Sequence, residues 1–62
     1  GNHLCLSIDD LPAFIKRLEA NKVKYEDWEG NPSQVTKRVD GVHQIYLKDP
    51  DGYWLEINDA RD

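Results

Sequence analysis

The chain has 62 residues and a formal net charge of −4 at pH 7. A domain of this length buries only about 60% of the surface that its unfolded chain exposes, so it usually relies on a disulfide, a metal ion or a partner for stability. The single cysteine, Cys5, excludes an internal disulfide, the scattered basic residues argue against a nucleic-acid surface, and no apolar run is long enough to span a membrane. With no signal segment visible, we expect a cytoplasmic protein without nucleic-acid or membrane partners.

The first predicted element is a strand from His3 to Ile8, because its apolar and polar residues alternate. One side of this strand carries Leu4, Leu6 and Ile8, and the other carries His3, Cys5 and Ser7.

An amphipathic helix is predicted next, capped by Asp9 and Asp10 and ending near Asn21. Pro12 suits its first turn, and asparagine tolerates the left-handed conformation at a helix end. Its apolar residues recur at helical spacing, namely Leu11, Phe14, Ile15 and Leu18.

After the helix, residues 23–28 are predicted as a second strand that a turn at Gly30-Asn31-Pro32 closes. The stretch 34–39 is ambiguous, and Asp40-Gly41 favours a tight turn. Residues 42–48 and 53–58 are predicted strands, and the Asp49-Pro50-Asp51-Gly52 segment between them has the composition of a type I turn.

The element order over residues 1–62 is therefore β-α-β-β-β, which predicts one α+β module with a mixed curved sheet and one helix on its convex face. The apolar side of the sheet is expected to contact the helix through Leu4, Leu6, Ile8, Ile45, Leu47, Leu55 and Ile57. The opposite side has the composition of a binding surface, with His3, Cys5, Ser7, Gln44, Tyr46, Trp54, Glu56 and Asn58.

Two residues on this polar side are candidate metal ligands. His3 and Glu56 lie on the first and last predicted strands, so their side chains converge if those strands are neighbours. Imidazole and carboxylate ligands suit Zn, Ni, Mn, Fe or Co, but two ligands leave such an ion incompletely coordinated. Alternation alone does not distinguish this metal site from an exposed histidine and a glutamate that faces solvent.

The closing segment Ile45-Tyr46-Leu47-Lys48-Asp49-Pro50-Asp51-Gly52-Tyr53-Trp54-Leu55-Glu56-Ile57, with Asn2-His3-Leu4 opening the first strand, resembles the C-terminal module of glyoxalase I and its relatives. These are the vicinal-oxygen-chelate proteins, which include fosfomycin-resistance enzymes, extradiol dioxygenases and bleomycin-binding proteins. The resemblance implies that His3 and Glu56 are ligands of a divalent metal ion and that Glu56 is also a general base.

The same resemblance implies that the chain is half of a metal-dependent lyase of the lactoylglutathione lyase type, acting on a small oxygen-rich substrate. A second βαβββ module completes the site, supplied by an identical chain in a homodimer or by an N-terminal half of a longer protein. The alternatives are a fosfomycin thiol transferase, a dioxygenase, or a metal-free binding module of the bleomycin-resistance type.

Other residues of the polar side have less specific roles. The resemblance implies that Tyr46 and Trp54 line the substrate cavity, although packing against a second module explains them equally well. Gln44 is a further candidate substrate contact, whereas Gln44 and Asn58 are also interpretable as solvated residues at strand ends. Cys5 is interpreted as a small buried thiol or as a residue that touches substrate. The turn residues are excluded from the site.

Alternation places His43 with Ile45 on the helix side, so it is not predicted as a ligand.

Overall fold

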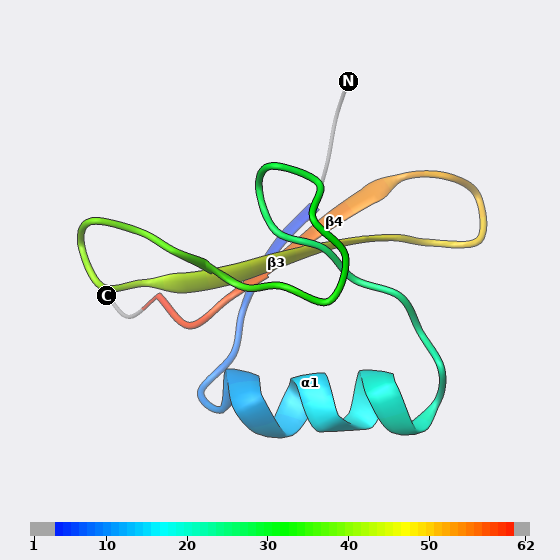
Figure 1. Cartoon of the computed structure of the whole chain (residues 1–62), viewed down its shortest axis with the longest axis horizontal. Coiled ribbons are helices and arrows are strands. Elements are labelled where there is room, and N and C mark those ends of the chain that lie inside the picture. The colour runs from blue at the N-terminus through cyan, green and yellow to red at the C-terminus, as the bar shows by residue number, and fades with distance from the viewer. Residues whose placement is uncertain (1–3, 61–62) are drawn as a thin grey trace.

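A helix lies across one face of a four-stranded sheet in the computed structural model, which describes residues 4–60 (Figure 1). The elements are β1 (Leu4–Ser7), α1 (Leu11–Ala20), β2 (Thr36–Lys37), β3 (His43–Lys48) and β4 (Trp54–Asn58). The strand order is β1-β4-β3-β2, in which β1 runs parallel to β4 and the other neighbours are antiparallel. This architecture confirms the predicted α+β class and brings the first and last strands side by side.

The helix begins and ends where its capping residues predict. The Asp10 carboxylate accepts a hydrogen bond from the Ala13 N–H at 3.1 Å, and the Asn21 amide group donates to the Arg17 carbonyl at 2.8 Å. The left-handed residue at the helix end is Lys22, with φ of 57°, and not Asn21, whose φ is −97°. With ten residues, α1 falls short of a membrane span, and no longer helix occurs among residues 4–60.

The core forms where α1 packs against the central strands. Ile45 of β3 and Leu11 of α1 are almost completely buried, and each such side chain contributes about 1.5–3 kcal/mol of hydrophobic stabilisation. The other buried apolar residues of this cluster are Leu18, Tyr25 and Ile57, with Ile8, Phe14, Ile15 and Leu47 packed against them.

The apolar side of β1 does not follow the prediction. Leu4 and Leu6 are 65% and 50% exposed, although alternation placed them against the helix. β1 is an edge strand, and the core cluster involves β3 and β4 but not these two leucines. The expected contact between the helix and the first strand is therefore wrong for Leu4 and Leu6 and correct for Ile8.

The predicted strand at residues 23–28 is also wrong. In that stretch only Glu26 forms β-bridges, which are isolated ones to Pro32 and Tyr46. The Asp27 carboxylate accepts hydrogen bonds from the backbone N–H groups of Glu29 and Asn31, which turns the chain away from an extended path. The second strand in sequence is instead β2, inside the stretch that was ambiguous.

The predicted turns at Asp40-Gly41 and Asp49–Gly52 are present. Gly41 and Gly52 adopt φ of +89° and +87°, a conformation that glycine accepts without steric cost. At the second turn, the Asp49 carboxylate accepts hydrogen bonds from the N–H groups of Asp51 and Tyr53. The Asp49–Gly52 motif therefore fixes the geometry between β3 and β4, as expected for a structural role.

Candidate functional site

The face of the sheet away from α1, called the open face below, carries two rows of polar side chains. The strand register creates both rows, because Glu56 of β4 is paired with Cys5 of β1 on one side and with Tyr46 of β3 on the other. Asn58 is paired in the same way with Ser7 and Gln44, which completes a set of six residues: Cys5, Ser7, Gln44, Tyr46, Glu56 and Asn58.

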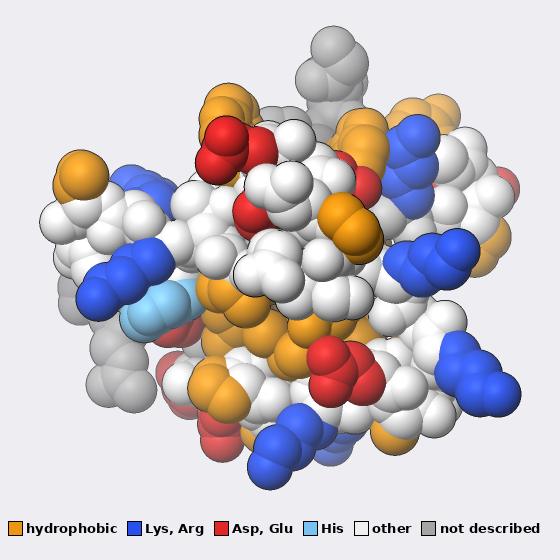
Figure 2. Space-filling model, viewed as in Figure 1, with side chains coloured by type: hydrophobic (Ala, Val, Ile, Leu, Met, Phe, Trp, Pro, Cys, Tyr) orange, Lys and Arg blue, Asp and Glu red, His pale blue; other side chains and the backbone are white. Residues whose placement is uncertain are grey.

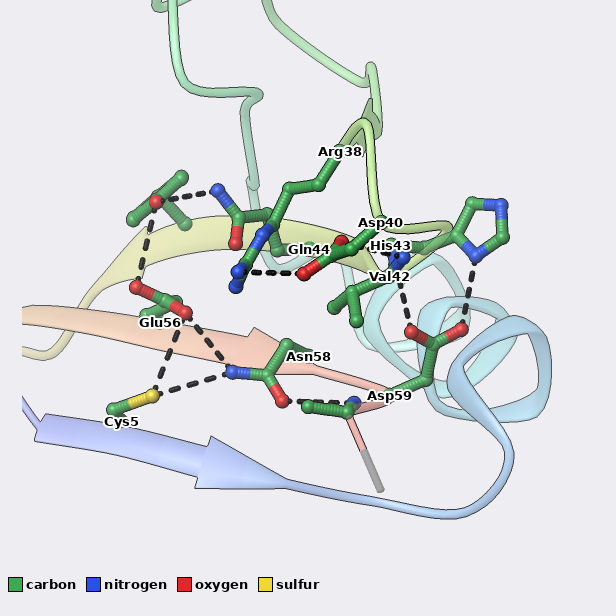
Figure 3. A network of polar contacts seen from close by, with 11 residues as sticks. Cys5, Arg38, Asp40, Val42, His43, Gln44, Glu56, Asn58 and Asp59 are labelled. Atoms are coloured by element: carbon green, nitrogen blue, oxygen red, sulfur yellow. Dashed lines mark hydrogen bonds and ion pairs between the residues drawn. The ribbon is translucent and has the colours of Figure 1, made fainter. Parts of the chain in front are cut away.

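Glu56 is at the centre of this set and is partly buried (Figure 3). Its Oε2 accepts hydrogen bonds from the Asn58 amide group at 2.9 Å and from the Cys5 thiol at 3.4 Å. Its Oε1 accepts a longer contact from the Tyr46 hydroxyl at 3.4 Å. Residues on three strands, Cys5, Tyr46 and Asn58, therefore orient the carboxylate. Such orientation is typical of a carboxylate that binds a metal or transfers a proton.

Asn58 holds this arrangement to the sheet. Its side-chain oxygen accepts hydrogen bonds from the Ser7 hydroxyl and the Ala60 N–H, both at 3.0 Å. Its amide nitrogen donates to the Cys5 sulfur at 3.2 Å as well as to Glu56. Because these contacts use both ends of a buried amide, they fix its orientation, and Asn58 presents N–H groups to the carboxylate.

The Tyr46 hydroxyl and the Cys5 thiol, which both donate to Glu56, stay protonated at neutral pH. Desolvation by burial raises the pKa of the Tyr46 hydroxyl, and the Glu56 charge raises it further. Desolvation and the hydrogen bond to Glu56 likewise raise the pKa of the Cys5 thiol. The Cys5 side chain is exposed, so its interpretation as a buried thiol is wrong.

Gln44 and Asn58 are not the solvated residues that their places near strand ends indicated. They are only 7% and 3% exposed, and the Gln44 amide donates a hydrogen bond of 2.8 Å to the Tyr46 hydroxyl. Sequence reasoning missed their burial because it depends on the loop and the neighbouring strands. A direct contact between Gln44 and a substrate stays a prediction.

The two predicted cavity residues share one cleft. Tyr46 and Trp54 line a cleft of about 390 Å³, together with Glu26, Pro32 and Lys48 among others. The Lys48 ammonium group lies 4.9 Å from the centre of the Trp54 ring, a cation–π contact that holds both side chains at the edge of the cleft. The structure thus places Tyr46 and Trp54 where a ligand of moderate size has room.

The structure describes only one of the two predicted metal ligands, Glu56. Glu56 lies on the open face, and β1 and β4 are neighbours as the prediction requires, but His3 lies outside the described residues. Within residues 4–60, no group of three or more histidine, cysteine, aspartate or glutamate side chains has the geometry of a metal site. The described part of the chain therefore supplies an incomplete ligand set.

A histidine–aspartate pair on the opposite side of the sheet was not predicted. The His43 ring nitrogen Nδ1 lies 2.9 Å from the Asp59 carboxylate, which also accepts the His43 backbone N–H at 2.7 Å. The strand register explains this pair: because Gln44 is paired with Asn58 in antiparallel strands, the residue before Gln44 and the residue after Asn58 are also neighbours. As predicted, His43 lies on the helix side of the sheet, where it borders residues of α1.

This pair borders a cleft of about 520 Å³ between α1 and the sheet, whose lining is mainly apolar and includes Leu11, Ile15 and Val35. Figure 2 shows the hydrophobic side chains that remain open to view between the helix and the sheet.

Comparison with known proteins gives a consistent result. No family model matches the chain. It is 38% identical to a lactoylglutathione lyase of Pseudomonas putida over 58 residues, which is 89% of this chain and 28% of that protein. It is 40% identical to glyoxalase I of Saccharomyces cerevisiae over 58 residues, which is 89% of this chain and 16% of the yeast protein.

The fold is also shared with a solved structure, that of the oxidase ChaP-H1. The TM-score is 0.80 at 23% sequence identity, and the match covers 97% of this chain and 51% of the ChaP-H1 chain. These likenesses confirm the resemblance of the chain to the vicinal-oxygen-chelate proteins. The module spans 28% and 16% of the two curated relatives and about half of the ChaP-H1 chain, so each of these proteins has further sequence beyond the matched module.

Proposed function

We propose that this module is half of a divalent-metal-dependent lyase of the glyoxalase type. The observation that carries the proposal is the oriented Glu56 carboxylate at the centre of the open face, in a chain 38–40% identical to a lactoylglutathione lyase and a glyoxalase I. The proposed substrate is the hemithioacetal of glutathione and a 2-oxoaldehyde, which has oxygens on adjacent carbons.

The donor set fits a divalent metal ion of the Zn, Ni, Mn, Fe or Co group. Glu56 offers a carboxylate whose orientation the Asn58 and Cys5 donors fix, and His3, the residue that precedes β1, is proposed as the imidazole ligand. When bound, such an ion supplies Lewis-acid stabilisation of negative charge on the substrate oxygens.

In the proposed reaction, Glu56 moves a proton between two adjacent substrate carbons. Its carboxylate removes the proton from the carbon that bears the thioether and hydroxyl groups, then returns it to the neighbouring carbonyl carbon, while the hydroxyl proton passes to the former carbonyl oxygen. The product is a 2-hydroxy thioester with the same atoms as the substrate, so no further reactant is needed. The Tyr46 hydroxyl and the Asn58 amide hold the carboxylate in place while the proton is transferred.

A second βαβββ module is proposed to complete the site, because the described residues carry too few ligands for a metal ion. The exposed edge strand β1, with exposed Leu4 and Leu6, supports such pairing, since an edge strand with apolar side chains readily joins another chain. The partner is an identical chain or another part of a longer protein. Measurement of the molecular mass in solution separates these two arrangements.

The test is turnover of the hemithioacetal to the thioester after removal of metal with a chelator and addition of each candidate ion. We expect activity that requires the ion, that Glu56→Gln abolishes, and that the exposed-loop variant Glu29→Gln retains. Thioester formation without any metal would contradict the proposal. Retained ligand binding without turnover would favour the metal-free binding module instead.

A further inference from the structure

The segment between α1 and β2 presents an exposed tryptophan from a firmly held backbone. Trp28 is 71% exposed. Before it, Glu26 exchanges two backbone hydrogen bonds of 2.8 Å with Tyr46 of β3. At Trp28 itself, the backbone N–H donates to the Thr36 hydroxyl of β2 at 2.7 Å. Hydrogen bonds to β3 and β2 therefore hold the backbone at and just before Trp28 in place.

Asp27 braces the turn that follows. Its Oδ1 accepts the N–H groups of Glu29 and Asn31 at 2.9 and 2.8 Å, and its Oδ2 accepts the Asn31 amide at 3.1 Å. Partial desolvation raises the pKa of Asp27, but these donors outweigh it and lower the pKa overall, so the carboxylate is charged at neutral pH. The loop is thus ordered around Trp28 before any ligand binds.

The indole lies close to the Glu56 network. The centres of the Trp28 and Tyr46 rings are 5.7 Å apart with a 57° angle between their planes, a favourable geometry for an aromatic pair. The hydroxyl of the same tyrosine contacts Glu56 Oε1. In Figure 1, the green segment that contains Trp28 rises past the sheet on the side away from α1. Trp28 and Glu56 are therefore joined through Tyr46 on the open face.

We propose that Trp28 determines substrate specificity by stacking its exposed indole against an aromatic or bulky apolar substituent of the molecule held at Glu56. This inference rests on the proposed function and adds to it the class of 2-oxoaldehyde that the site prefers. A single exposed apolar residue is common on protein surfaces. Trp28 differs because a braced loop positions it one aromatic ring away from the candidate catalytic carboxylate.

The test compares two thioesters of glutathione that differ only in this substituent. S-lactoylglutathione carries a methyl group, and S-mandeloylglutathione carries a phenyl group. Stacking on an aromatic ring predicts that the complete, metal-loaded protein binds the phenyl compound about tenfold more tightly than the methyl compound. Trp28→Ala should remove this preference and leave the affinity for the methyl compound nearly unchanged, while Trp28→Phe should retain most of it.

The matched control is Tyr53→Ala, because Tyr53 is also an exposed aromatic residue, 62% exposed, beside the distant Asp49–Gly52 turn. This variant should keep the full preference. If Trp28→Ala also keeps it, or if that variant dissociates the protein into smaller species, the inference is overturned while the proposed function stands. If the wild-type protein binds neither thioester, both the inference and the proposed substrate class are wrong.

Discussion

Tyr46→Phe tests the hydrogen-bond network of the open face most sharply. The substitution removes the hydroxyl that accepts the Gln44 amide at 2.8 Å, and Gln44 is only 7% exposed. A buried donor left without a partner costs about 1–3 kcal/mol. The contact from Tyr46 to Glu56 is long at 3.4 Å and adds little. Since Tyr46 is only partly buried, we expect a loss in the lower half of that range, about 1–2 kcal/mol.

The assay is equilibrium urea unfolding followed by far-UV circular dichroism, with an unchanged dependence on urea as the sign that only stability has changed. Gln44→Leu supplies the control, because it removes the amide that needs the tyrosine hydroxyl. In the double variant the two costs should fall short of additivity by about 1 kcal/mol. A cost for Tyr46→Phe below about 0.3 kcal/mol, or strictly additive costs, would refute the reasoning.

Two further predictions concern the turns and the acid limit of stability. Gly52→Ala should lower the free energy of unfolding by about 1–2 kcal/mol, because the φ of +87° is unfavourable for alanine. A new Cβ there meets no atom within 4 Å, so no steric clash adds to this cost. Gly41→Ala, at φ of +89° and also without a clash, should cost the same in urea unfolding. A change without cost at either glycine would contradict the assigned turn conformations. The His43 backbone N–H, opposed by desolvation and helped by the His43 ring, lowers the pKa of Asp59 below its usual 3.8. The Asp59 contribution to stability is therefore present above that value and lost as the pH falls through the lowered pKa, so Asp59→Asn should flatten the acid dependence of the urea midpoint. An identical acid dependence in that variant would show that the His43–Asp59 pair is not formed in solution.

The sequence predicted the elements whose signals are local and strong. The helix follows from its caps and apolar spacing, and the strands around Tyr46 and Glu56 follow from alternation and from the Asp49–Gly52 turn. The face that each of these residues occupies was predicted correctly, because alternation within a strand does not depend on distant parts of the chain.

The incorrect predictions involve properties that depend on distant contacts. Leu4 has the right alternation for a core residue, but only the strand order shows that β1 lies at an edge. The stretch before Trp28 has apolar residues typical of a strand, yet the Asp27 side chain competes for backbone N–H groups and turns the chain. The burial of Gln44 likewise depends on neighbours that no local pattern specifies.

Among the candidate site residues, Glu56 is the one whose position on the open face the sequence predicted best, and the strand register explains why. Residues on three strands meet at this carboxylate only when β1 is parallel to β4 and β3 is antiparallel to it. The family resemblance supplied that arrangement indirectly, through a closing segment whose order of residues is specific. The donors from Asn58 and Cys5 were not predicted as partners of Glu56, because their convergence requires the register itself.

The most direct test of the central claim, that Glu56 helps to hold a divalent metal ion, is the metal content of the purified protein after chelation and reconstitution. We expect one ion for each site formed by two modules in the wild type and in Glu29→Gln. Glu56→Gln should lose the ion at the same free metal concentration while its circular dichroism spectrum stays unchanged. A Glu56→Gln protein that retains the full complement of metal would contradict the account.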